Sequence, residues 1–119
     1  MRQEFIIPTA PVPKGRPRLG RRGRVFTPKR TKNYEIVVAA NAIAAGVKST
    51  DQPVEMEIHF YMKTPTSADI DNLVKSVCDS LNGIAYVDDR QVMRLVAAKH
   101  PSKKPHTTVC ITHNEPGVA

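Results

Sequence analysis

Residues 54–83 read VEMEIHFYMKTPTSADIDNLVKSVCDSLNG and carry the clearest structural signals of the chain. From Val54 to Lys63, apolar and polar residues alternate strictly, which is the pattern of a β-strand with one dry face. The segment Thr64–Ser67 breaks this strand. Apolar residues then recur at helical spacing, and Gly83 follows where helices commonly end. The stretch predicts a strand, a turn and an amphipathic helix from Asp71 or Asn72 to Asn82.

Further strands and another helix are predicted on either side of this unit. The strands are expected at Phe5–Ile7, from about Gln91 to Lys99, and at Thr107–Thr112. The helix is expected from Tyr34 to Val47, in a segment that Pro28 or Thr31 opens. Its apolar face is expected to consist of Ile36, Val37, Ala40, Ile43, Ala44 and Val47. The resulting order, β-α-β-α-β-β, predicts an α+β fold with a mixed sheet and two helices. A chain of 119 residues with 40% hydrophobic content fits a single domain, residues 1–119.

Composition excludes several classes of protein. Aromatic residues make up 5% of the chain and Trp is absent, so base stacking is not expected as the main mode of nucleic-acid recognition. Neither a secretion signal nor an apolar run long enough to span a bilayer is present. Cys78 and Cys110 lie in apolar segments without metal-ligand spacing. We therefore expect a cytoplasmic protein with reduced, buried cysteines and no membrane association.

Positive charge is concentrated in one segment, residues 8–30, which we call the basic loop. Nine of the 18 basic residues lie in or next to it, and subtracting them from the formal charge of +7 leaves −2. Several Pro and Gly residues exclude a helix there and predict a stiff, extended loop. A solvated arm without a partner is one interpretation; a loop that grips the phosphates of nucleic acid is the other. The candidate DNA-binding residues are Lys14, Arg16, Arg18, Arg21, Arg22, Arg24, Lys29 and Arg30.

Four aspartates gather on either side of the second helix. Asp69 and Asp71 stand at its start, and Asp88 and Asp89 stand just before the next strand. Helix capping explains the presence of one acid of the first pair. The second pair, considered by itself, is explained by a turn. Like charges held close raise each other's pKa unless a cation neutralises them. If the two loops converge, the acids predict a site for Mg²⁺, which prefers oxygen ligands and retains several waters.

Lys75 follows Asp71 by four residues and therefore shares its helical face. An exposed ion pair of this kind adds only about 0.3–0.5 kcal/mol, so stability is a weak reason for the lysine. Beside a metal, its ammonium is suited to hold a phosphate or to neutralise charge on a leaving oxygen. The histidines His59, His100, His106 and His113 show no catalytic or ligand spacing, and we interpret them as structural.

The sequence Asp69-Ile-Asp-Asn-Leu-Val-Lys75, followed after the helix by Asp88-Asp-Arg-Gln-Val92, resembles the signature of the RusA family of Holliday-junction resolvases. The likeness extends over nearly the whole chain, and the joined motif is far more specific than either half. It implies that Asp69, Asp71 and Asp89 are catalytic, metal-binding acids, that Asp88 supports them and that Lys75 is essential. The choice of Asp89 rather than Asp88 as the direct ligand depends on the length of the loop between Leu81 and Asp88.

The same resemblance implies the activity. It is that of a small, homodimeric, prophage-type endonuclease that depends on Mg²⁺, with Mn²⁺ as a substitute, and resolves four-way DNA junctions in recombination and repair. Metal-assisted hydrolysis is expected to leave 5′-phosphate and 3′-hydroxyl ends, and a two-fold dimer matches the two-fold symmetry of a junction. No small-molecule cofactor is expected. The rival hypothesis is a non-enzymatic, basic nucleic-acid-binding module, in which the aspartates only cap and turn. A sugar-nucleotide transferase is excluded because the chain is too short for a nucleotide-binding fold.

Overall fold

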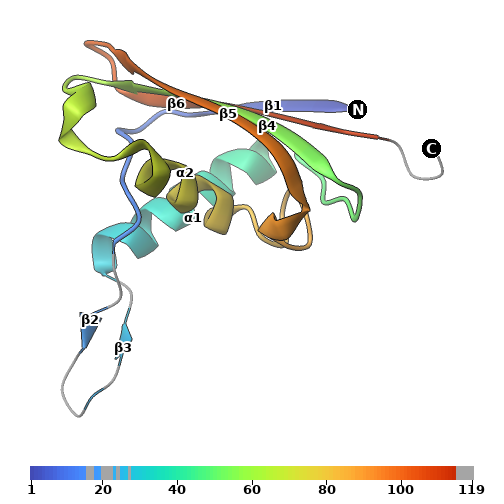
Figure 1. The fold of residues 1–119 in the computed structure, drawn as a ribbon, viewed down its shortest axis with the longest axis horizontal. Coiled ribbons are helices and arrows are strands. Elements are labelled where there is room, and N and C mark those ends of the chain that lie inside the picture. The colour runs from blue at the N-terminus through green and yellow to red at the C-terminus, as the bar shows by residue number, and fades with distance from the viewer. Residues whose placement is uncertain (16–17, 20–22, 24, 27, 115–119) are drawn as a thin grey trace.

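The computed structural model describes residues 1–15, 18–19, 23, 25–26 and 28–114 (Figure 1). Within these residues the larger sheet consists of β1 (Arg2–Ile7), β4 (Val54–Met62), β5 (Val92–Pro101) and β6 (His106–His113). The helices are α1 (Lys29–Ala44) and α2 (Ile70–Ser80), with short 3₁₀ turns η2 (Pro65–Ser67) and η3 (Asp89–Gln91). The expected α+β fold with a mixed sheet and this order of main elements is confirmed.

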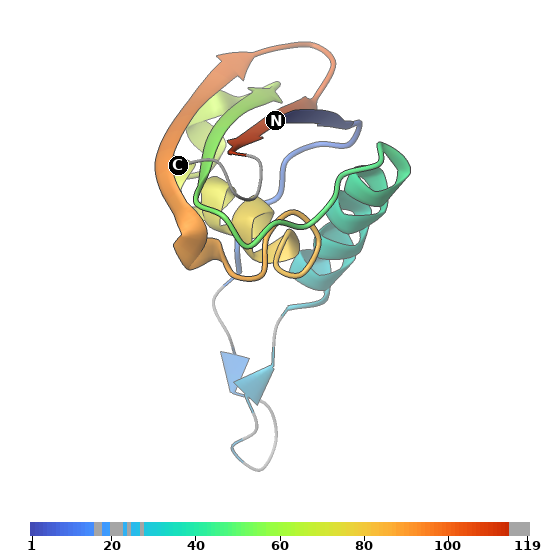
Figure 2. The same ribbon diagram turned by 90° about the vertical axis from the view of Figure 1, so that its right-hand side faces the viewer.

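The strand order in this sheet is β1-β6-β4-β5. β6 runs antiparallel to both of its neighbours, whereas β5 runs parallel to β4. α2 is therefore the crossover between two parallel strands, as such a connection requires. Figure 2 shows the sheet curving over the helices, which cover one of its faces. The other face carries no helix among the described residues.

The core lies between the helices and the covered face of the sheet. Alternate residues of β4 point into it, as the sequence pattern predicts, and the side chains between them point away. Ile58 and Phe60 of β4 and Leu73 and Val77 of α2 are fully buried. Each such apolar side chain contributes about 1.5–3 kcal/mol by leaving water. This packing fixes α2 firmly along the sheet.

The prediction for α1 is wrong in the face that it buries, whereas the expectation that Pro28 opens the helical segment is confirmed. The helix begins at Lys29, directly after Pro28, and its buried residues are Thr31, Tyr34, Val38 and Ala42. Ile36 and Ile43, assigned to the buried face, are 67% and 63% exposed. Apolar residues occur on both sides of this helix, so periodicity alone does not select the side that packs. No helix within the described ranges is long and apolar enough to cross a membrane.

The basic loop contains a short antiparallel hairpin, β2 (Arg18–Leu19) paired with β3 (Val25–Phe26). Figures 1 and 2 show that these strands project away from the body of the molecule, on the side opposite the sheet. The loop was expected to reach residue 30 without a helix. Because α1 starts at Lys29, the last two basic residues assigned to the loop belong instead to the first turn of a helix.

Candidate functional site

Asp69 and Asp71 stand at the N-terminal end of α2. Asp69 is the N-cap residue with extended backbone angles, φ −75° and ψ 138°, yet its side chain makes no capping hydrogen bond to the described residues. Asp71 lies in the first turn and accepts a hydrogen bond from the amide of Asn72 at 2.9 Å. Both side chains are exposed. Capping therefore does not account for Asp69, and both carboxylates are accessible to a ligand from solvent.

Asp88 and Asp89 stand at the other end of the β4-α2-β5 unit, where η3 leads into β5. Asp88 accepts a hydrogen bond from the amide of Arg90 at 3.0 Å, and its own amide donates to Oε1 of Gln91 at 2.9 Å. Gln91 Nε2 in turn donates to the carbonyls of Thr50 and Gln52, each at 2.9 Å. Asp88 thus caps the turn, which leaves Asp89 as the acid of this pair that is available to a metal.

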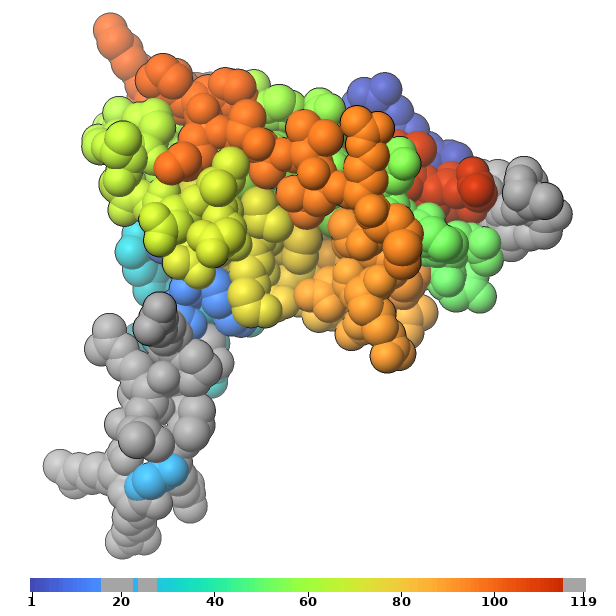
Figure 3. All heavy atoms as spheres, viewed as in Figure 1, coloured from blue at the N-terminus to red at the C-terminus, as the bar shows by residue number. Residues whose placement is uncertain are grey.

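A groove of about 570 Å³ runs between α2 and β5. Its polar lining among the described residues is Asp71, Lys75 and Asp89, and the rest of its wall is apolar: Ile70, Val74, Cys78, Val92, Leu95 and Ala97. Figure 3 shows the face on which α2 and β5 lie side by side. Burial raises the pKa of the Cys78 thiol to about 11, so this thiol stays protonated and unreactive at neutral pH. The groove therefore joins three of the predicted catalytic residues along one surface.

The two acidic pairs do not meet within one chain. Because β5 is parallel to β4, the residues after β4 and those before β5 lie at opposite ends of α2. Asp79, which lies beside Asp89, is eight residues after Asp71, or about 12 Å along the helix axis. In the described part of the chain no three His, Cys, Asp or Glu side chains are grouped closely enough to hold a metal ion. The expected convergence of the two loops is thus not met in a single chain.

Sequence reasoning overlooked Asp79, the acid that does lie next to Asp89. Burial raises the pKa of Asp89, and the neighbouring carboxyls of Asp79 and Asp88 raise it further, while Lys75 opposes them. Lys75 pairs with Asp79, at 3.4 Å between Nζ and Oδ2, rather than with Asp71. The available signal was the position of Asp79, four residues after Lys75, which puts both on one helical face.

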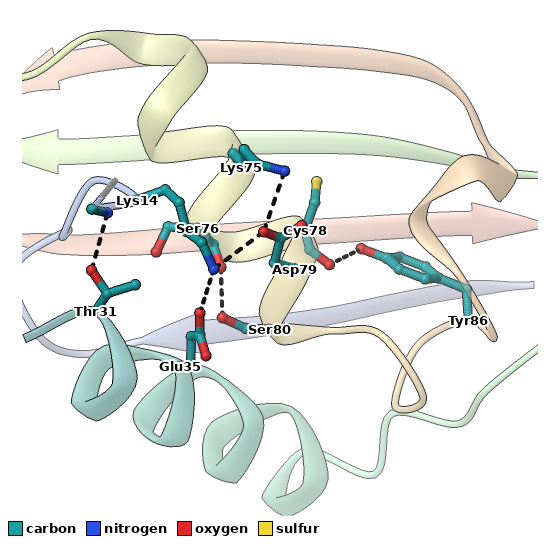
Figure 4. Close-up of polar contacts among 10 residues, drawn as sticks. Lys14, Thr31, Glu35, Lys75, Ser76, Cys78, Asp79, Ser80 and Tyr86 are labelled. Atoms are coloured by element: carbon teal, nitrogen blue, oxygen red, sulfur yellow. Dashed lines mark hydrogen bonds and ion pairs between the residues drawn. The ribbon is translucent and has the colours of Figure 1, made fainter. Parts of the chain in front are cut away.

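Lys14 joins this cluster from the start of the basic loop. Its ammonium donates to Glu35 of α1 at 2.8 Å and lies 3.3 Å from Asp79 Oδ2 (Figure 4). Its backbone amide donates to the carbonyl of Asn72 at 2.9 Å. Burial disfavours the charge of Lys14, but the two carboxylates outweigh it and raise the pKa of the ammonium. The contacts within the protein indicate that Lys14, predicted to bind DNA, anchors the loop.

The two ends of the basic loop touch each other at what we call the neck, formed by Lys14, Gly15, Pro28 and Thr31. The amide of Gly15 donates to Thr31 Oγ1 at 3.0 Å. A Cβ on Gly15 would lie 2.8 Å from that oxygen and 2.9 Å from Cγ of Pro28, closer than side chains approach in proteins. Glycine at this position therefore lets the ends of the loop close against α1.

The other predicted DNA-binding residues divide by position. Lys29 and Arg30 are exposed in the first turn of α1. The backbone of Arg18 forms part of β2, whereas Arg16, Arg21, Arg22 and Arg24 lie outside the described residues. The hairpin thus emerges from a neck that contacts the first turn of α2 through Asn72.

The histidines lie away from the groove. His59 and His100 stack with Tyr61 and His106 on the open face of the sheet, with ring centroids 4.3–5.0 Å apart. His59 Nδ1 and His100 Nε2 are 2.8 Å apart, and His59 Nε2 is 3.0 Å from Glu57. His106 Nδ1 lies 2.7 Å from the carbonyl of Lys104, so each of the three rings has a polar partner within the protein.

The part of the chain that forms the groove and the neck is similar to known proteins. The family described as Endodeoxyribonuclease RusA matches residues 8–112, from the start of the basic loop to near the end of β6. The "Uncharacterized protein YqaN" of Bacillus subtilis (strain 168) is 31% identical over 133 residues, which cover 91% of this chain and 94% of that protein. The family match includes both acidic pairs and Lys75. The chain therefore belongs to the RusA family of endodeoxyribonucleases.

Proposed function

We propose that this protein is a Mg²⁺-dependent endonuclease that resolves four-way DNA junctions by paired nicks. The observation that supports this most directly is the groove in which Asp71, Lys75 and Asp89 lie along one surface, in a chain of the RusA family. The basic loop supplies the charge that branched DNA requires, because Lys and Arg side chains displace counterions from phosphates. The substrate we propose is the four-way junction.

The donor set suits a hard divalent ion. Carboxylate oxygens are the ligands that Mg²⁺ prefers, and an unneutralised carboxyl in a crowded acidic environment favours a bound cation. The raised pKa of Asp89 is a sign that this carboxyl is crowded by other acids. Asp69, Asp71 and Asp89 would hold the ion, which Mn²⁺ would also fit. The chemistry supplied by the bound ion is Lewis-acid polarisation of a phosphodiester and activation of water.

Lys75 has a separate role in this proposal. Its side chain is 60% exposed on the groove side of α2, one turn beyond Asp71. Its ammonium is placed to neutralise charge on the phosphate and on the leaving oxygen as the bond breaks. Asp88 keeps η3 in shape through the bond from the Arg90 amide and so holds Asp89 at the start of β5.

A two-fold homodimer would bring the separated acids together. If two copies pack groove to groove in opposite directions, Asp69 and Asp71 of one protomer approach Asp89 of the other. The apolar wall of the groove, which includes the exposed side chains of Ile70 and Leu95, supplies surface that such a contact would cover. Two equivalent sites would then face the two-fold symmetric strands of a junction, as paired nicking requires.

The proposal predicts that Asp71→Asn and Asp69→Asn each abolish junction cleavage in Mg²⁺. Junction binding should persist or tighten, because a carboxylate that repels phosphate is removed. The measurement is cleavage of a labelled four-way junction beside a native-gel binding assay. Glu55→Gln, on the open face of β4, is the control and should cleave normally. A folded wild-type protein that binds junctions but never cuts them would favour the non-enzymatic binding module.

Mixing variants tests where the acids meet. Asp71→Asn and Asp89→Asn are each expected to be inactive alone. A mixed dimer retains one complete set of acids if the site spans two protomers, and no complete set if it lies within one. We therefore expect the mixture to regain single nicks, at up to half of the sites in each mixed dimer. A mixture that stays inactive, despite exchange of subunits shown by differently tagged chains, would contradict a shared site.

A further inference from the structure

We infer that Asp79 is a positioning residue, which ties the neck of the basic loop to the catalytic groove and holds Lys75 in place. This inference rests on the proposed function, since it assigns Asp79 a part in the same reaction. Asp79 does not line the groove among its described residues. It would therefore act through Lys75 and Lys14 and not by touching the DNA.

One oxygen of Asp79 serves two lysines. Oδ2 lies 3.3 Å from Nζ of Lys14 and 3.4 Å from Nζ of Lys75 (Figure 4). The side chain of Asp79 is only 20% exposed, whereas that of Lys75 is 60% exposed. The carboxylate is thus the more buried partner, and the lysine that lines the groove reaches back to it. Figure 4 shows the continuous path from Glu35 of α1 through Lys14 and Asp79 to Lys75.

Asp79 and Asp89 both stand at the C-terminal end of α2, Asp79 in its last turn and Asp89 in η3. Asp79 contacts two parts of the proposed machinery, Lys14 of the neck and Lys75 of α2. The carboxylate therefore connects the neck to the lysine of the groove.

Stability alone is a weak explanation for this arrangement. An exposed lysine paired with an acid four residues away adds only about 0.3–0.5 kcal/mol. A role in holding Lys75 and the neck accounts for one carboxylate that lies between two lysines from different parts of the chain.

The contacts of the neck reach both ends of α2. The Lys14 amide is bonded to Asn72 in the first turn of α2, and its ammonium to Asp79 in the last turn. The start of the basic loop is therefore fastened to both ends of the helix that carries Asp71 and Lys75. DNA held by the loop would be kept in a fixed relation to the groove, as accurate placing of a reacting phosphate requires.

Asp79→Asn is the test, because it keeps the shape of the side chain and removes its charge. Glu35→Gln is the matched control, since it takes away the other carboxylate of Lys14 but contacts neither Lys75 nor Asp89. Single-turnover cleavage of a four-way junction in Mg²⁺, with enzyme in excess, gives the rate, and a binding titration in Ca²⁺ gives the affinity. We expect Asp79→Asn to cut about tenfold more slowly with junction affinity changed less than twofold, and Glu35→Gln to cut at the wild-type rate.

The inference fails if Asp79→Asn cuts as fast as the wild type, or if Glu35→Gln slows cleavage equally. It also fails if slower cleavage accompanies an equal loss of affinity and of thermal stability, because that pattern describes a purely structural residue. If Asp79→Asn does not fold, Asp79→Ser, with a smaller polar side chain, replaces it under the same criteria. A wild-type protein that does not cleave at all contradicts the proposed function instead, so the two failures are distinguishable.

Discussion

The two ends of α2 differ in how the chain holds them. At the N-terminal end, Asp69 and Asp71 are exposed, and the Asp69 side chain makes no capping bond to the described residues. At the C-terminal end, Leu81 and Tyr86 are fully buried, and the Tyr86 hydroxyl donates to the carbonyl of Cys78 at 2.7 Å. Buried side chains thus enclose the C-terminal end of the helix, whereas two exposed acids stand at its N-terminal end.

The difference also explains how the groove remains accessible. Ile70, at the exposed end, is 37% exposed and lines the groove. The C-terminal end is closed by the turn from Leu81 to Tyr86, in which the Gly83 amide donates to the Tyr86 carbonyl at 2.7 Å. Gly83 has φ +79°, which a residue with a side chain rarely adopts. A tight, buried closure thus supports one end while the other stays open to DNA.

The largest expected difference between the two ends of α2 is in the loss of stability when an apolar side chain is shortened. Leu81→Ala removes a fully buried side chain and should lower the free energy of unfolding by about 2–5 kcal/mol. Ile70→Ala, at the exposed end, should lower it by less than about 1 kcal/mol. Urea unfolding followed by circular dichroism measures both. Equal losses would mean that the N-terminal end of α2 is as firmly packed as the C-terminal end.

Much of the fold is predictable because its signals are local. Strict alternation identifies β4 and its buried face, and Gly83 marks the end of α2 within a few residues. The face of α1 is not predictable in this way, because Ile36 and Ile43 compete with Tyr34 and Val38 for the core. Only packing against the rest of the fold decides between them, and it selects the stripe that contains Ala42.

The site is less predictable because it depends on strand order. The motif identifies Asp69, Asp71, Lys75 and Asp89 as candidates, but no residue states that β5 lies parallel to β4. That pairing alone sends the two acidic pairs to opposite ends of α2. Asp79 escaped notice because one acid in an amphipathic helix is ordinary until its neighbours are known. The neighbours of each end of α2 are therefore set by packing between segments that lie far apart in the sequence.

The smallest effect concerns the pH dependence of stability at the crowded end. Burial, Asp79 and Asp88 raise the pKa of Asp89 in the folded chain above its ordinary value of 3.8. The folded state then holds this proton more tightly than the unfolded state, so stability falls as the pH rises through the raised pKa. Asp89→Asn removes that loss and should raise the melting temperature slightly at pH 7 in the absence of divalent ions.

At low pH the difference in melting temperature between Asp89→Asn and the wild type should disappear. Below pH 3.8 the Asp89 carboxyl is protonated in both states, so Asp89→Asn and the wild type should melt alike. Thermal unfolding at pH 3.3 and pH 7, with Glu55→Gln as a control on the open sheet face, separates this effect from a general change of net charge. A lower melting temperature for Asp89→Asn at pH 7 would show that the carboxylate stabilises the fold. The C-terminal end of α2 would then lack the crowding of acids that distinguishes it from the N-terminal end.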